Sequence, residues 1–135
     1  MSEDLSNRDL AGRGIDIHAP YDASNVFARI LRGEIPNDRV YEDNDFVAFR
    51  DIAPQAPTHI VLVPRGEPPT SPAGIDTAQE ALSGRMLRVA AEIARAEGLE
   101  EAGYRLVINC GTDAGQTVLH LHLHILGGET LGPLA

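Results

Sequence analysis

Three histidines alternate with apolar residues near the C-terminal end of the chain, at His120, His122 and His124. Successive side chains of a strand point to opposite faces, so this spacing predicts three imidazoles on one face, with neighbours about 6.5–7 Å apart. An imidazole with a pKa near ~6.5 is largely neutral at pH 7, so it can attack an electrophile, carry a proton or bind a metal ion. The pattern therefore predicts a chemical site and not a solvated edge strand.

A polar loop, residues 109–117, leads into this strand. Gly111 and Gly115 permit a positive φ, which allows backbone N–H groups to converge on an anion. The loop lacks the Gly-Lys-Ser/Thr sequence and the following helix of a P-loop, which excludes that layout for Mg²⁺-dependent phosphoryl transfer. Cleavage of a phosphorus ester or amide needs a nucleophile, charge stabilisation and a proton for the leaving group. Imidazoles and backbone amides can supply all three.

The composition narrows the class of protein. The chain has 135 residues and a formal net charge of −9, which fits one acidic domain and opposes non-specific binding of nucleic acid or an anionic membrane. A single cysteine, Cys110, excludes an internal disulfide and a zinc site built from several cysteines. No apolar run approaches the ~20 residues of a membrane span, and the acidic N-terminus is unlike a signal peptide. We therefore expect a cytoplasmic domain without a membrane or nucleic-acid partner.

Hydrophobic periodicity and turn residues predict an α+β domain with an antiparallel sheet of about five strands and two helices. Residues 1–20 are expected to form a mobile extension and residues 21–135 the domain. The first helix is expected to begin after the N-cap Ser24, and a capping box of Thr77 with Glu80 begins the second, which runs to Ala96. A surface crossing is expected over residues 65–75. The predicted strands are 39–42, 46–50, 58–63, 104–109 and 118–126.

Three sequence blocks together resemble one family. The chain reads Asn109-x-Gly-x-x-Ala-Gly-Gln-x-Val-x-His-x-His-x-His124, which resembles the signature of the histidine triad (HIT) superfamily. A second block, Asp51-Ile-Ala-Pro-Gln-Ala-Pro-Thr-His59, and a first helix containing Phe27-x-x-Ile-x-x-Gly-Glu-Ile-Pro36 resemble the Hint-like branch, the purine nucleoside phosphoramidases. The resemblance runs from about residue 25 to residue 128. It implies a HIT-like fold that dimerises into a continuous sheet.

The resemblance also implies a role for each matching residue. His122 matches a nucleophile that attacks the α-phosphorus and forms a covalent nucleotidyl-histidine, and His124 matches a group that hydrogen-bonds the phosphate oxygens. His120 and His59 match positions that orient the nucleophile and complete a relay of histidines. The positions that match the nucleotide-binding site are Phe27, Ile30, Phe49, Asp51, Ile52, Asn109, Gly115, Gln116, Thr117 and His124.

The implied activity is cleavage at the α-phosphate of a purine nucleotide, such as an adenosine phosphoramidate, with AMP as product. Asn25 and Ala28 stand where some bacterial relatives carry the cysteines of a structural zinc site, so we expect no metal and no cofactor. Three alternatives stay open. The chain could be a dinucleoside polyphosphate hydrolase of the Fhit type, a regulatory nucleotide-binding module with little turnover, or a metalloenzyme that uses the three alternating histidines. The tail after His124 lacks the aromatic residue that shapes the leaving-group side in Hint-like proteins.

Overall fold

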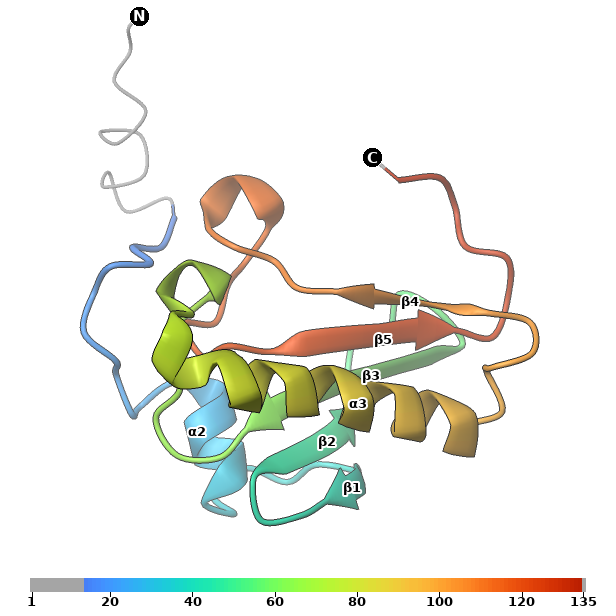
Figure 1. The fold of residues 1–135 in the computed structure, drawn as a ribbon, viewed down its shortest axis with the longest axis horizontal. Helices are drawn as coiled ribbons and strands as arrows, with labels where there is room; N and C mark the ends of the chain where they lie inside the picture. Colours follow the sequence, from blue (N-terminus) through green and yellow to red (C-terminus); the bar gives the residue numbers. More distant parts are fainter. Residues whose placement is uncertain (1–13, 135) are drawn as a thin grey trace, which may run out of the picture.

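A five-stranded antiparallel sheet forms the centre of the molecule (Figure 1). The computed structural model describes residues 14–134. The strands are joined in the order β1-β2-β3-β5-β4, and all neighbours are antiparallel. The predicted α+β class, with five strands and two helices, is confirmed. The elements are α2 (Val26–Leu31), β1 (Arg39–Glu42), β2 (Phe46–Arg50), β3 (Thr58–Pro64), α3 (Glu80–Ala96), β4 (Tyr104–Val107) and β5 (Leu123–Gly127).

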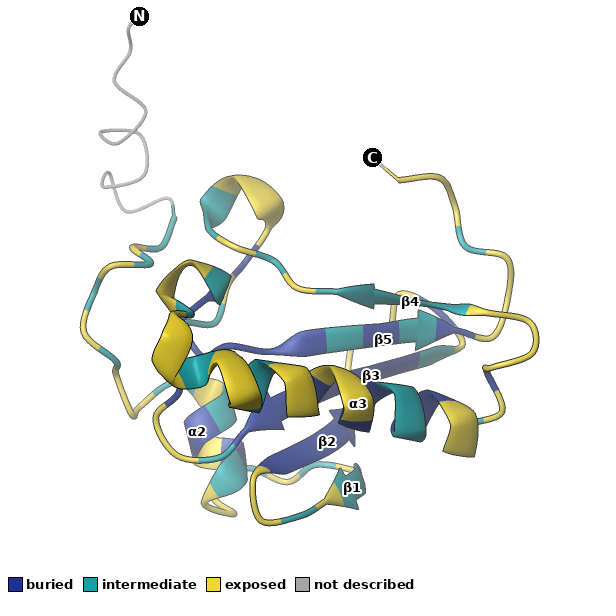
Figure 2. Ribbon diagram, viewed as in Figure 1, coloured by how far each residue is buried: buried dark blue, intermediate teal, exposed yellow. Residues whose placement is uncertain are grey.

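The two helices contribute to different apolar clusters because β2 and β3 are buried on both faces. Ile60 and Leu62 of β3 pack with the buried side of α3, whereas Val61 and Val63 pack with Ile30 of α2. Figure 2 shows the exposed residues of α3 turned away from the sheet. His59 lies two residues before Val61 on β3, so it shares the face that carries α2. This face becomes the site described below.

The alternating histidine segment is only partly a strand. β5 begins at Leu123, so the predicted strand over residues 118–126 is wrong in its first half. The physical reason is a different hydrogen-bond partner: the backbone N–H of Leu121 donates to the carbonyl of Pro69, 2.9 Å away, and not to a neighbouring strand. His120 therefore lies in a bend before the sheet. β4 likewise ends at Val107 and not at Asn109.

The polar caps that precede the two helices each lie one residue away from the expected ones, and α3 itself begins later, at Glu80. Asn25, and not Ser24, caps α2, because its side-chain oxygen accepts the N–H of Ala28. The capping box that precedes α3 joins Asp76 to Gln79, and a short 3-10 turn separates it from the helix. Each capping residue is the sequence neighbour of the expected one, Asn25 for Ser24 and Asp76 for Thr77. The sequence predicted the type of cap correctly but not its position.

Part of the N-terminal segment packs on the domain. The N–H of Ile15 donates to Oγ1 of Thr112 at 3.1 Å, and the hydroxyl of Thr70 donates to the carbonyl of Ile17 at 2.7 Å. These contacts involve residues that the sequence assigned to a mobile extension, and the boundary near residue 20 stays a prediction. Residues 1–13 lie outside the described residues. Within the described part of the chain, no helix is long and apolar enough to cross a membrane.

The edge of the sheet leads to a first prediction, on the oligomeric state. β4 is an outer strand, and Ile108 beside it and Leu87 on α3 are 36% and 51% exposed. An outer strand whose free edge has no partner, together with exposed apolar side chains, favours association with a second copy about a two-fold axis. We expect sedimentation equilibrium at micromolar protein to give twice the chain mass of 14.5 kDa. A mass equal to that of one chain would contradict the predicted homodimer.

Candidate active site

His122 is held with one ring nitrogen free. Its Nδ1 lies 2.6 Å from the backbone carbonyl oxygen of His120. A carbonyl oxygen only accepts, so Nδ1 carries the proton and the lone pair of the neutral ring lies on Nε2. The ring is 6% exposed and meets the edge of Phe27, with 4.8 Å between the ring centroids. This geometry presents Nε2 as a nucleophile with a fixed orientation.

His59 and His124 form a second unit whose protons can also be assigned. The backbone N–H of Gln55 donates to Nδ1 of His59 at 3.0 Å, so the proton of the neutral His59 ring lies on Nε2. That Nε2 lies 2.8 Å from Nδ1 of His124, which must therefore accept. His124 is left with an N–H at Nε2. The pair thus offers a hydrogen-bond donor next to His122, whose ring centroid is 5.1 Å from that of His124.

The third unit fixes His120, which is fully buried. Its Nε2 lies 2.9 Å from the carbonyl oxygen of Pro64 and so carries the proton. Its Nδ1 accepts a hydrogen bond from the hydroxyl of Tyr21 at 2.7 Å. Both nitrogens are therefore used by the protein. His120 has no nitrogen left for a ligand, and the orienting role that the sequence predicts for it stays a prediction.

All four histidines are held in the neutral form. Burial lowers the pKa of His120 and of His124 to about 4, because an imidazolium ion loses hydration there. Burial also lowers the pKa of His122, against the opposing effects of the His120 carbonyl and Asp51. The pKa of His59 is lowered for the same reason, although the nearby Asp51 carboxylate opposes the shift. Neutral His122 is the form that keeps a lone pair for attack.

The polar loop that precedes the histidines is braced by Gln116. The side-chain oxygen of this buried residue accepts the N–H of Gly111 at 2.8 Å, and its amide nitrogen donates to the carbonyls of Thr70 and Val118. Its backbone N–H donates to the carbonyl of Gly111. Every donor of Gln116 is thus used within the protein. Gln116 therefore braces the loop, and the phosphate contact predicted for it from the sequence stays a prediction.

The other predicted loop residues differ from one another, because the N–H of Gly115 donates to the carbonyl of Thr112 whereas, in the part of the chain that the structure describes, the side chains of Asn109 and Thr117 stay free. Gly111 and Gly115 adopt φ values of 86° and 87°, which bend the chain into the tight turn expected there. Within residues 14–134, the side chains of Asn109 and Thr117 make no hydrogen bond to the protein. Val107 pairs with His124 in the last pair of β4 and β5, and Asn109 lies two residues beyond it. Contact of Asn109 and Thr117 with a bound phosphate stays a prediction.

A cavity of about 190 Å³ lies between α2, the end of β2 and the loop after it. Ile52 at this cavity is 97% exposed, whereas Phe49 and Ile30 are buried and also belong to the core. An exposed isoleucine beside an apolar cavity is suited to close over a flat ring. The cavity is lined by all five residues predicted to surround a nucleoside, which are Phe27, Ile30, Phe49, Asp51 and Ile52. Phe27 connects this cavity to the ring of His122.

Comparison with known proteins identifies the family of the chain. The family model described as HIT domain matches residues 32–131. The chain belongs to the HIT family. The match covers the braced loop, all four histidines of the site and the part of the cavity that follows α2, so the family resemblance read from the sequence is confirmed.

Relatives within the HIT family include an enzyme and several solved structures. The protein is 50% identical over 109 residues to the purine nucleoside phosphoramidase of Escherichia coli K12, covering 81% of this chain and 91% of the relative. A HIT family hydrolase from Legionella pneumophila has 43% identity and a TM-score of 0.76, covering 79% and 95% of the two chains. A HIT family hydrolase from Clostridium thermocellum has 38% identity and a TM-score of 0.78, covering 82% and 96%.

Two structural supports of this HIT site were missed by sequence reasoning. Tyr21 belongs to no recognisable motif, and its contact with His120 spans 99 residues of the chain. The segment over residues 65–75 was expected to be a surface crossing, but Thr70 and Ser71 within it are buried. The carbonyl of Thr70 accepts from Gln116, so this segment supports the loop. The three prolines within residues 65–75 were the available signal for a fixed conformation there.

The histidines do not form the metal site that the alternative hypothesis requires. Among the described residues, the cluster of possible ligands joins Asp51, His59 and His124, whose donor atoms all lie within 4.8 Å of one another. His120 and His122 are absent from this cluster. In addition, Asn25 uses its side chain to cap α2, and Ala28 offers no ligand atom, so the positions of a structural zinc site do not fit zinc.

A second prediction concerns chelation. The ring nitrogens of His59 and His124 are already joined to each other at 2.8 Å, so a metal ion would have to break that hydrogen bond. We expect turnover of an adenosine phosphoramidate to be unchanged, within about twofold, after dialysis against EDTA. Loss of turnover in the chelator, followed by recovery with added zinc, would favour the metalloenzyme alternative.

A third prediction concerns pH. Because the folded site keeps its histidines neutral below their ordinary pKa of ~6.5, the nucleophile should stay unprotonated as the pH falls through 6.5. The value of kcat/KM for an adenosine phosphoramidate should therefore stay level as the pH falls from 8 through 6.5. Below that, protonation of His120 and His124, with pKa values of about 4, should reduce it. A kcat/KM that halves near pH 6.5 would show an ordinary, exposed histidine instead.

Proposed function

We propose that this HIT protein is a nucleotidyl hydrolase that acts as a purine nucleoside phosphoramidase. The observation that carries the proposal is the free Nε2 of His122, fixed by the hydrogen bond of Nδ1 to the His120 carbonyl and placed beside Phe27 of the nucleoside-sized cavity. The 50% identity with the Escherichia coli protein of that name supports the same substrate class. We also propose that the chain acts in the cytoplasm as a homodimer.

In the proposed first step, Nε2 of His122 attacks the α-phosphorus of a nucleoside phosphoramidate. A bond from phosphorus to Nε2 forms as the bond from phosphorus to the substrate amine breaks. The resulting positive charge on the imidazole is shared with the His120 carbonyl through Nδ1–H. The N–H at Nε2 of His124, with Asn109 and Thr117, would stabilise the phosphoryl oxygens.

The leaving amine needs one proton, and the histidine pair supplies a route for it. His124 can give its Nε2 proton to the amine while His59 passes its own to Nδ1 of His124, 2.8 Å away. The same nitrogen of His59 lies 3.4 Å from the carboxylate of Asp51. After this step the pair is one proton short, opposite the positive charge on the His122 imidazole that is bonded to phosphorus. The water of the second step restores the proton at Nε2 of His124, and the proton on Nδ1 of His124 returns to His59.

In the proposed second step, water attacks the same phosphorus and the bond to His122 breaks. The attacking water gives one proton to Nε2 of His124, and the products are the free enzyme and a nucleoside monophosphate such as AMP. Oδ1 of Asp51 accepts the N–H of Ala53 at 2.8 Å, and Oδ2, which lies 3.4 Å from Nε2 of His59, has a lone pair for the ribose hydroxyls. In this proposal the imidazoles, the His120 carbonyl and the side chains of Asn109 and Thr117 supply each part of the charge balance.

The substrate class is tested by comparing two substrates with the same purine nucleoside. We expect kcat/KM for an adenosine phosphoramidate to exceed that for a diadenosine polyphosphate by at least about a hundredfold, a difference of ~2.7 kcal/mol in transition-state binding. A preference for the diadenosine compound would favour the Fhit-type alternative. Binding of AMP without turnover of either substrate would favour the regulatory module.

A further inference from the structure

The N-terminal segment from Ile15 to Tyr21 contacts three separate parts of the active site. At one end, Ile15 exchanges hydrogen bonds with the side chain of Thr112 in the braced loop, at 3.1 and 3.4 Å. In the middle, the carbonyl of Ile17 accepts from Thr70, whose own carbonyl holds Gln116. Figure 1 shows this segment passing along the edge of the domain from the loop to α2.

At its other end, the segment delivers the hydroxyl of Tyr21 to Nδ1 of His120, 2.7 Å away. His120 is fully buried, and its second nitrogen is bonded to the carbonyl of Pro64. The His120 ring is therefore fixed at both nitrogens, one of them by Tyr21. Its backbone carbonyl then orients His122 through the 2.6 Å hydrogen bond. A continuous path of hydrogen bonds and covalent structure thus joins Tyr21 to the nucleophile.

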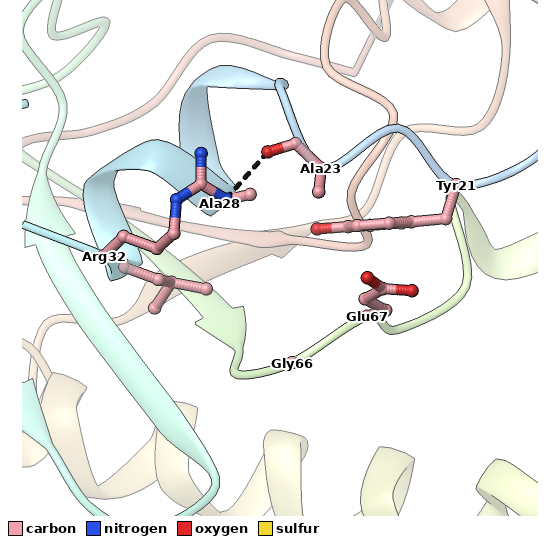
Figure 3. A pocket seen from close by; sticks show the side chains of 7 residues that line it. Tyr21, Ala23, Ala28, Arg32, Gly66 and Glu67 are labelled. Carbon is pink, nitrogen blue, oxygen red and sulfur yellow. Dashed lines mark hydrogen bonds between the residues drawn. The ribbon is translucent and has the colours of Figure 1, made fainter. Parts of the chain in front are cut away.

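Tyr21 is itself held in place by its surroundings. Its ring lines a pocket of about 210 Å³ together with Ala28 of α2, Arg32 and Glu67 (Figure 3). Arg32 of that pocket donates to the carbonyl of Ala23 at 2.8 Å, which ties the chain after Tyr21 to the end of α2. Burial raises the pKa of Tyr21, so the hydroxyl stays protonated and donates to His120.

We propose that Tyr21 is a positioning residue that aligns the nucleophile His122 by fixing the ring of His120. This inference rests on the proposed function, because it needs His122 to be the attacking group. Without the hydroxyl, Nδ1 of the buried His120 ring loses its donor, and the ring can then move about the remaining contact with Pro64. Movement of His120 changes the direction in which its carbonyl holds His122.

The test replaces Tyr21 with phenylalanine, which removes the hydroxyl and keeps the ring. We expect Tyr21→Phe to lower kcat/KM for an adenosine phosphoramidate by about tenfold, equivalent to ~1.4 kcal/mol, with the Kd of AMP unchanged within about twofold. Tyr41→Phe is the matched control, since Tyr41 is also half-buried and donates to Asp43 at 2.7 Å, on β1 away from the histidines. Tyr41→Phe should leave both values unchanged within about twofold.

A spectroscopic measurement separates positioning from a general loss of stability. In Tyr21→Phe, the ¹⁵N resonance of His120 Nδ1 should shift toward the value of an unprotonated ring nitrogen that accepts no hydrogen bond. In Tyr41→Phe it should stay unchanged. Wild-type kcat/KM in Tyr21→Phe, or an unchanged Nδ1 resonance, would overturn the role of Tyr21. Absence of turnover in the wild-type protein would instead overturn the proposed function, while the resonance would still report the hydrogen bond.

Discussion

His122→Asn should lower the turnover of an adenosine phosphoramidate by at least about a thousandfold, while the Kd of AMP changes by less than about tenfold. Asparagine has a similar size and can still donate to the His120 carbonyl, but its amide nitrogen has no lone pair for attack. The groups proposed to hold the nucleotide, at the cavity and on the loop, belong to other residues. Turnover is measured by release of AMP, and binding by calorimetry.

His18→Asn supplies the matched control for the same change of side chain. His18 lies in the N-terminal segment, and the hydrogen bond recorded for it is made by its backbone N–H to Asp16. This variant should keep both turnover and AMP binding within about twofold. If His122→Asn retains more than about a tenth of wild-type turnover, covalent catalysis by His122 is wrong.

The second large effect is expected for His124→Asn, which should reduce kcat/KM by about a hundredfold. The change removes the N–H that the relay presents to the phosphoryl oxygens, and it leaves the Nε2 proton of His59 without its 2.8 Å acceptor. In contrast to His122→Asn, this variant should also bind AMP more weakly, because the donor contacts the phosphate of the product. The measurements are again turnover and calorimetric binding of AMP.

The two histidine variants are therefore expected to differ in how they change turnover and AMP binding. His122→Asn should separate turnover from binding, whereas His124→Asn should weaken both. Adenosine, which has no phosphate, supplies a further control, since its affinity should be the same for His124→Asn and the wild-type protein within about twofold. Unchanged kcat/KM in His124→Asn would show that its Nε2–H does not act on the phosphoryl group.

Local sequence patterns were sufficient for most of the fold. The apolar run over residues 58–63 and the turn at residues 43–45 gave β3 and the β1–β2 hairpin, because burial on both faces and tight turns leave a local signal. The alternation around His120 was misleading for the opposite reason. The spacing fits a strand, but the backbone at Leu121 pairs with Pro69 in a distant loop, and such a partner leaves no periodic signal.

In the site, likewise, the sequence identifies residues that belong to local motifs and misses contacts between distant segments. The family motifs predicted that His59, His122 and His124 belong to one site, and the three side chains lie side by side. The motifs also predicted five residues that line the nucleoside-sized cavity. They did not show that Gln116 uses all its donors within the protein, since that depends on carbonyls brought close only by folding. Tyr21 could not be found at all, because a single tyrosine before a helix has no spacing that points to His120.

The most direct test of the account is the mass of the protein during turnover. The wild-type chain is mixed with excess adenosine phosphoramidate, denatured in alkali within milliseconds and weighed intact, because a phosphorus–imidazole bond survives base better than acid. We expect a fraction of the protein to gain the mass of one adenylyl group, with fragmentation placing it on His122, and no gain for His122→Asn. Rapid AMP release with no adduct on the wild-type protein, or an equal adduct on His122→Asn, would contradict a covalent nucleotidyl-histidine.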